Sequence, residues 1–162
     1  MITLAPPLFP FPIEAIENQI LKQLFPEVPV VVGGVEASLR RFTHYDYWQD
    51  KLLPSILVES GADWLVYGMG EMPVLELAYK ISIGESVEMI RRTKQIGYIT
   101  NTKSSFFTDS LLLNSYEECL KSKEAFAANF NIIESESNSW SYKHIIETVG
   151  DKFVLITSPW PL

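Results

Sequence analysis

The feature that most constrains the fold is the stretch of residues 30–51, in which a short apolar run meets a pair of glycines. Val30, Val31 and Val32 are consecutive β-branched residues, which is typical of a buried strand. Gly33-Gly34 then lets the backbone turn sharply and approach a neighbouring group closely. The simplest interpretation is a strand-to-helix turn in an α/β layer.

The residues after this turn are crowded with charged and aromatic side chains, a density that fold formation alone does not require. Together with a second glycine turn they form a candidate ligand- or substrate-positioning site: Gly33, Gly34, Glu36, Ser38, Arg40, Arg41, His44, Tyr45, Asp46, Tyr47, Trp48, Asp50, Gly68, Gly70 and Glu71. In this hypothesis Arg40 or Arg41 binds a carboxylate or phosphate through two hydrogen bonds. The alternative is an ion-pair cluster that pins a surface loop.

The order of elements around this stretch predicts part of an open parallel sheet. Apolar spacing predicts helices over residues 13–24, 52–60 and 73–83, and short buried strands over residues 28–32 and 64–67. We expect the two strands to be parallel and adjacent, with a right-handed crossover between them. Both glycine turns then lie at the carboxyl ends of the strands, where such sheets bind ligands.

The second half of the chain has weaker signals. We predict a short helix at residues 86–92, a strand at 96–100, a loop at 101–109, a helix from the capping box at Ser115 to about residue 130, a polar linker at 135–139, a helix at 140–149 and a strand at 153–157. Two firm strands and two weaker ones are fewer than an open α/β sheet usually has. We therefore expect missing strands from elsewhere in a longer protein or from a partner chain, and self-association of the isolated chain.

Composition excludes several classes of function. The formal net charge of −7 argues against a nucleic-acid-binding surface. No apolar run is long enough to span a membrane, and we expect a cytoplasmic protein. His44, Asp46 and Asp50 offer ligand atoms, but His144 is far away in the sequence, so we expect a histidine–carboxylate hydrogen bond and no metal. No residue has a spacing that indicates a catalytic role.

Residues 33–51 read GGVEASLRRFTHYDYWQDK, and this run closely resembles the signature of the YgiQ-type radical SAM proteins. The resemblance continues through residues 55–58, 62–63, 67–68 and 71–78, and it returns more faintly at residues 150–154 and 159–162. It implies a partial Rossmann-like parallel sheet with flanking helices, similar to cobalamin-binding domains, ahead of a radical SAM barrel. For the full-length protein it implies a 4Fe-4S cluster and S-adenosylmethionine.

The cluster-binding CxxxCxxC motif of that family is absent here, since Cys119 is the only cysteine, and we expect it beyond residue 162. We expect an extended lead-in at residues 1–12, a Rossmann-like segment at residues 13–84, and a linker with an αβ extension at residues 85–162. On this hypothesis the chain is an accessory segment that positions substrate at the barrel of the same polypeptide and is not catalytic alone. The alternative is a stand-alone α/β module that binds a small anionic ligand or a protein partner.

Overall fold

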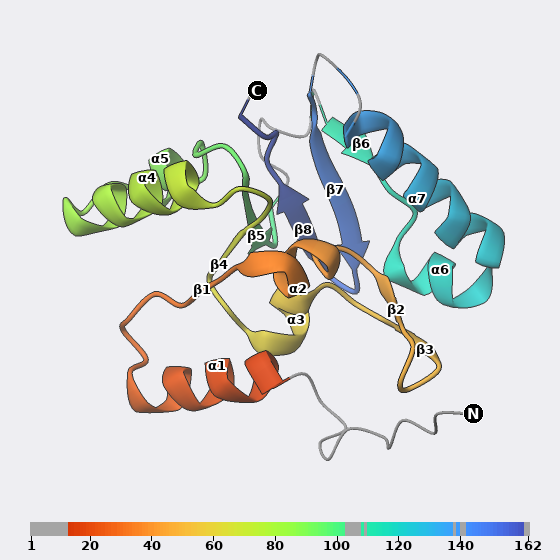
Figure 1. The fold of residues 1–162 in the computed structure, drawn as a ribbon, viewed down its shortest axis with the longest axis horizontal. Helices are drawn as coiled ribbons and strands as arrows, with labels where there is room; N and C mark the ends of the chain where they lie inside the picture. Colours follow the sequence, from red (N-terminus) through yellow and green to blue (C-terminus); the bar gives the residue numbers. More distant parts are fainter. Residues whose placement is uncertain (1–12, 103–107, 109, 138, 140–141, 161–162) are drawn as a thin grey trace.

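The computed structural model describes residues 13–102, 108, 110–137, 139 and 142–160, which build an open sheet with helices on both faces (Figure 1). Its six strands lie in the order β1-β4-β5-β8-β7-β6. They are β1 (Val31–Val32), β4 (Trp64–Val66), β5 (Ile96–Thr100), β6 (Ser110–Leu112), β7 (His144–Val149) and β8 (Lys152–Ile156). A separate hairpin consists of β2 (His44–Asp46) and β3 (Lys51–Leu53). The helices are α1 (Ile13–Leu24), α2 (Gly34–Leu39), α3 (Ile56–Ser60), α4 (Glu71–Ser82), α5 (Val87–Ile90), α6 (Tyr116–Lys121) and α7 (Lys123–Ser137). The predicted α/β class is confirmed.

The predicted parallel pair forms one edge of the sheet. β1 and β4 are adjacent and parallel, with Val31 opposite Trp64. The connection between them consists of α2, the β2–β3 hairpin and α3. Nothing in the sequence pattern indicated the hairpin, and the helix predicted over residues 52–60 begins only at Ile56, because β3 pairs with β2. The helix ends as predicted at Gly61, which has a left-handed φ of 68°.

The rest of the sheet departs from the parallel arrangement that the resemblance implied. β5 pairs antiparallel with β4 and with β8, and β8 pairs antiparallel with β7. The helix predicted over residues 140–149 is wrong, because residues 144–149 form β7. Gly150-Asp151 makes a two-residue hairpin turn into β8, with Gly150 at a φ of 61°. Four of the six residues of β7 are β-branched and favour a strand: Ile145, Ile146, Thr148 and Val149.

A further strand, β6, completes the far edge of the sheet, so the sheet has more strands than the sequence predicted. β6 pairs parallel with β7, and α6 and α7 connect the two. The predicted capping box is confirmed, because the Ser115 hydroxyl accepts from the Glu118 amide and Glu118 accepts from the Ser115 amide. α7 continues to Ser137, into the predicted polar linker. Most of the predicted loop at residues 101–109, and the predicted lead-in at residues 1–12, lie outside the described residues.

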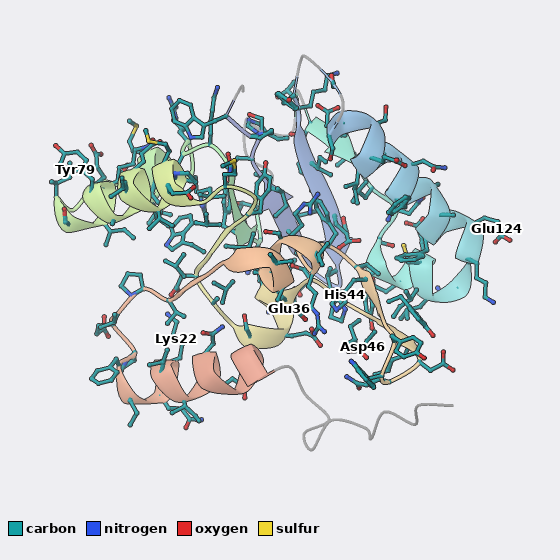
Figure 2. The ribbon with its side chains drawn as sticks, in the orientation of Figure 1. Lys22, Glu36, His44, Asp46, Tyr79 and Glu124 are labelled. Carbon is teal, nitrogen blue, oxygen red and sulfur yellow. The ribbon has the colours of Figure 1, made fainter. Side chains whose placement is uncertain are left out.

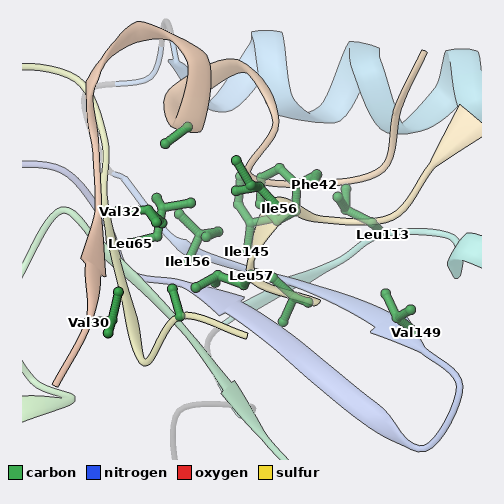
Figure 3. Packing of buried hydrophobic residues seen from close by; sticks show 13 residues of the cluster. Val30, Val32, Phe42, Ile56, Leu57, Leu65, Leu113, Ile145, Val149 and Ile156 are labelled. Carbon is green, nitrogen blue, oxygen red and sulfur yellow. The ribbon is translucent and has the colours of Figure 1, made fainter. Parts of the chain in front are cut away.

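Each face of the sheet carries its own hydrophobic core. One core lies under α3, α7 and the segment after α2, and its residues Ile56, Leu57 and Leu65 have no exposed surface (Figure 3). The other lies under α4 and α5 and contains Trp64 and Leu77. Successive strand residues alternate between the two cores, as expected for a sheet that is covered on both sides. Among the described helices, none is long and apolar enough to cross a membrane.

Gly97 of β5 offers a test of the antiparallel register between β5 and β8. It lies opposite Ile156, and a β-carbon on Gly97 would come within 2.5 Å of the Ile156 Cδ1 atom. We expect Gly97→Ala to lower the free energy of unfolding by about 1–2 kcal/mol through overpacking. Ile156→Val removes the clashing methyl group. The double variant should therefore lose less unfolding free energy than the two single variants lose together. Urea unfolding of the four proteins measures the coupling, and strictly additive effects would contradict this register.

Candidate functional site

The two glycine turns lie beside each other, after β1 and after β4. Gly34 has a φ of 85° and Gly68 a φ of 65°, a conformation that favours glycine. Ser38 of α2 joins the turns: its hydroxyl donates to the Gly34 carbonyl oxygen (2.7 Å) and accepts from the Gly68 amide (3.1 Å). The second turn continues to Gly70, the residue before α4, and Glu71 is the first residue of that helix. The parallel strands β1 and β4 thus bring two turns, 34 residues apart in the sequence, to the same edge of the sheet.

Gln95 connects the second turn to residues near the end of the described chain. Its side-chain amide donates to the carbonyl oxygens of Tyr67 and Met69, both at 2.7 Å. Its side-chain oxygen accepts from the Trp160 amide at 3.4 Å, and its own backbone amide donates to the Ser158 carbonyl oxygen at 2.9 Å. Residues 158–160 therefore lie beside the second turn. Sequence reasoning missed Gln95, because nothing local distinguishes this glutamine from an ordinary polar residue before a strand.

Arg41 extends from the segment after α2 toward the residue that follows β4. Its guanidinium carbon lies 5.4 Å from the centre of the Tyr67 ring and 5.6 Å from that of Phe42, and it donates a hydrogen bond to the Ser38 carbonyl oxygen. Burial lowers the pKa of Arg41 and raises the pKa of Tyr67. The two rings fix the guanidinium through cation–π contacts. A guanidinium has five N–H donors, so an arginine held in this way can still bind a carboxylate or phosphate.

Arg40 forms an ion-pair cluster with carboxylates of neighbouring elements. Its Nε atom lies 2.5 Å from Glu36 Oε1, and its Nη2 atom lies 3.9 Å from Asp46 Oδ2 (Figure 2). Burial raises the pKa of Glu59 on α3, and the nearby charge of Arg40 acts in the opposite direction. The Arg40 carbonyl oxygen also accepts from the Ile56 amide at 2.9 Å. Arg40 thus holds α2, the hairpin and α3 together.

The aromatic candidates lie on the β2–β3 hairpin, which Figure 1 shows on the other side of α2 from α4. The rings of Tyr47 and Trp48 pack edge to face at 5.7 Å and are largely exposed. The Tyr45 hydroxyl donates to Asp50 within the hairpin. The structure therefore brings Ser38 and Arg41 to the second turn, whereas these hairpin side chains pair with one another.

His44 and Glu147 lie where the segment after α2 crosses β7. The Nδ1 atom of His44 donates to the Phe42 carbonyl oxygen at 3.2 Å, and burial lowers the pKa of His44. The Thr43 amide donates to Glu147 Oε2 at 2.8 Å, and the Glu147 side chain is fully buried. Sequence reasoning missed Glu147, because its segment was interpreted as a helix. A glutamate alternating with β-branched residues was the available signal.

The described residues do not fit a metal ion or an iron–sulfur cluster. Among them, no group of three or more His, Cys, Asp or Glu side chains could hold a metal. Cys119 is buried in α6, where burial raises the pKa of its thiol to about 11, whereas a ligand thiol must be deprotonated. His144 lies at the start of β7, not in the predicted helix, and its Nδ1 atom accepts from the Ser158 amide at 2.9 Å.

Comparison with known protein families identifies the family of this chain. The family model described as "Radical SAM N-terminal" matches residues 14–162, and the chain belongs to this family. Its relatives are UPF0313 proteins. One from Porphyromonas gingivalis is 49% identical over 147 residues, covering 89% of this chain and 23% of the relative. One from Bacteroides thetaiotaomicron is 44% identical (89% and 25%), and one from Geobacter sulfurreducens is 37% identical (88% and 24%).

The chain thus spans about a quarter of the length of the curated relatives it matches. No solved structure matches the chain significantly.

Proposed function

We propose that this domain is an accessory segment of a YgiQ-like radical SAM enzyme and positions substrate at the mouth of a barrel in the same polypeptide. The barrel would carry the 4Fe-4S cluster and S-adenosylmethionine, since this chain has a single cysteine. The role of the domain is then to bind and orient substrate. Radical chemistry itself belongs to the barrel.

The observation that carries this proposal is the position of residues 158–160 beside the two glycine turns. Gln95 ties these residues to the second turn through the Trp160 amide and the Met69 carbonyl oxygen. In a protein in which a barrel follows this domain, the barrel therefore begins at the edge where open α/β sheets bind ligands. Large apolar side chains on α2, in the second turn and at the start of α4 are exposed, as at surfaces that a partner covers: Val35 (78%), Leu39 (69%), Met69 (76%) and Met72 (61%).

Arg41 is the residue of this edge best suited to hold a substrate. It lies near two aromatic rings and donates to the Ser38 carbonyl oxygen, so its guanidinium loses little freedom when it binds an anion. We assign it a carboxylate or phosphate group of the substrate. Arg40, engaged with Glu36 and Asp46, keeps the supporting segment in place.

Two substitutions in the full-length protein separate these roles. The measured quantity is the extent to which a small-molecule extract of the source cells stimulates cleavage of S-adenosylmethionine. Arg41→Gln should reduce this stimulation about tenfold and should keep the wild-type iron content. The reason is that hydrogen bonds to a charged group contribute about 1.5–3 kcal/mol. Arg40→Gln should instead lower the melting temperature, because it leaves Glu36 and Asp46 without their cation.

Arg92→Gln is the matched control, since Arg92 is exposed at the end of α5, and it should change neither property. The proposal fails if the stimulation lost by Arg41→Gln equals its loss of folded, iron-loaded protein. It also fails if no extract fraction stimulates the wild-type protein.

A further inference from the structure

We infer that the cavity between α5 and the start of β4 is a second binding site, for a small zwitterion with an apolar body, of the class of apolar α-amino acids. Arg91 binds its carboxylate and Glu85 its ammonium group. We refer to this site as the α5 cavity, and its walls include Trp64, Ile81, Glu85, Val87, Arg91 and Tyr98. The site goes beyond the proposed function, because it lies at the opposite end of β4 from the second glycine turn.

The size and walls of the α5 cavity suit a small organic molecule. Its volume is about 500 Å³, within the range of small-molecule sites. The rings of Trp64 and Tyr98 pack edge to face, with their centres 5.8 Å apart. Ile81 and Val87 add apolar surface from α4 and α5. The body of the ligand is therefore expected to be apolar, with room for an aromatic ring.

Arg91, the residue after α5, provides a cation in this cavity. Its side chain is half-buried, and its guanidinium carbon lies 5.0 Å from the centre of the Tyr98 ring. Within the described part of the chain, no carboxylate forms an ion pair with Arg91, and its buried Nε atom has no hydrogen-bond partner. A partly buried charge needs a partner, and the planar guanidinium matches the two oxygens of a carboxylate.

The hydroxyl of Tyr98 is a second buried polar group in the wall of the same cavity. Tyr98 is 2% exposed, and its hydroxyl has no hydrogen-bond partner among the described residues. Burial raises the pKa of Tyr98 to about 12, so the hydroxyl keeps a proton to donate at pH 7. Buried polar atoms are nearly always satisfied, so two exceptions at one cavity need a reason. A carboxylate beside Arg91 provides an acceptor for both groups.

The charges of all the lining residues together select a zwitterion over a simple anion. Three charged residues line the α5 cavity: Asp63, Glu85 and Arg91. Asp63 is already neutralised, because the Lys22 Nζ atom lies 2.5 Å from its Oδ2 atom. Glu85 is half-buried and forms no ion pair within the described ranges. One unpaired cation and one unpaired anion remain, so a ligand with both a carboxylate and an ammonium group neutralises the site.

Three probes with the same aromatic body test this assignment: L-phenylalanine, 3-phenylpropanoate, which lacks the ammonium group, and 2-phenylethylamine, which lacks the carboxylate. In calorimetry we expect the 162-residue chain to bind L-phenylalanine at least about tenfold more tightly than either analogue. Tenfold is the factor for about 1.4 kcal/mol from each additional ion pair. Chemical-shift changes should be centred on α5 and on residues 63–64.

Two substitutions assign the two charges separately. Arg91→Gln should bring the affinities for L-phenylalanine and 2-phenylethylamine within about twofold, because the carboxylate loses its partner. Glu85→Gln should do the same for L-phenylalanine and 3-phenylpropanoate, because the ammonium group loses its partner. If Arg91→Gln does not fold, Tyr98→Phe replaces it. That change removes a hydroxyl that has no partner among the described residues of the free protein, and it should weaken binding of both carboxylate probes.

Arg92→Gln and Glu88→Gln are the matched controls, since both residues are exposed neighbours that do not line the α5 cavity. Both variants should keep the two tenfold preferences. The inference is overturned if L-phenylalanine does not bind at millimolar concentration or binds no more tightly than either analogue. It is also overturned if the shift changes lie elsewhere, or if each preference survives the substitution that should remove it.

Discussion

Glu147→Gln is expected to stabilise the protein above neutral pH and to leave its stability nearly unchanged in acid. Burial raises the pKa of Glu147 from its ordinary value of 4.5 to about 7, although the hydroxyl and amide of Thr43 act in the opposite direction. The folded protein therefore holds a proton on Glu147 in a range of pH where the unfolded chain has released it. The stabilisation is fully present below pH 4.5 and is lost as the pH rises through about 7.

The difference between a pKa of 4.5 in the unfolded chain and a pKa of about 7 in the folded protein corresponds to about 3 kcal/mol of unfolding free energy. A glutamine is neutral throughout, and its side-chain oxygen can still accept from the Thr43 amide. Urea unfolding of both proteins across this range of pH gives the difference in stability. That difference should favour Glu147→Gln increasingly as the pH rises.

Glu118→Gln is a control for which we expect the opposite dependence of stability on pH. Hydrogen bonds from Ser115 lower the pKa of Glu118, so its contribution is present at neutral pH and disappears as the pH falls through the lowered pKa. Glu118→Gln should therefore be destabilising at neutral pH, and this effect should vanish in acid. A difference that does not vary with pH for Glu147→Gln would show that the buried carboxyl does not titrate as the structure requires.

The first half of the fold could be predicted because its signals are local. Val30, Val31 and Val32 followed by two glycines indicate a strand and a turn, and the same pattern recurs at residues 64–70. Two strands in this order, separated by a helix, have one strongly preferred geometry. The structure shows these strands as an adjacent parallel pair with joined turns.

The second half was harder because its patterns are ambiguous over short lengths. Ile145, Ile146 and Val149 fit one face of a helix as well as a strand, and only the β-branched side chains and the Gly150-Asp151 turn decide for a strand. Because residues 140–149 were interpreted as a helix, the sequence also provided no indication that Glu147 is buried in a strand. The link between Glu147 and Thr43 joins residues 104 positions apart, and no local pattern indicates such a contact.

A second buried polar network joins α7 to Asn114, which follows β6. The Oδ1 atom of Asn129 accepts from the backbone amide (2.8 Å) and the side-chain amide (2.9 Å) of Asn114. Its Nδ2 group donates to the Asn114 carbonyl oxygen at 2.9 Å and to Cys119 Sγ at 3.3 Å. Asn129 is 4% exposed, so water cannot replace these partners. A side chain at this position must both donate and accept.

Asn129→Asp is therefore expected to lower the free energy of unfolding by about 3 kcal/mol at pH 7, although the two side chains have nearly the same shape. A carboxylate keeps the acceptor atom, but its second oxygen faces the Asn114 carbonyl oxygen without a proton to donate. Protonation restores a donor, so the loss should shrink as the pH falls. Urea unfolding at pH 7 and in mild acid measures both effects. Asn131→Asp, at an exposed position on the same helix, should change stability by less than about 0.5 kcal/mol. Equal losses for the two variants would mean that Asn129 does not hold α7 to β6.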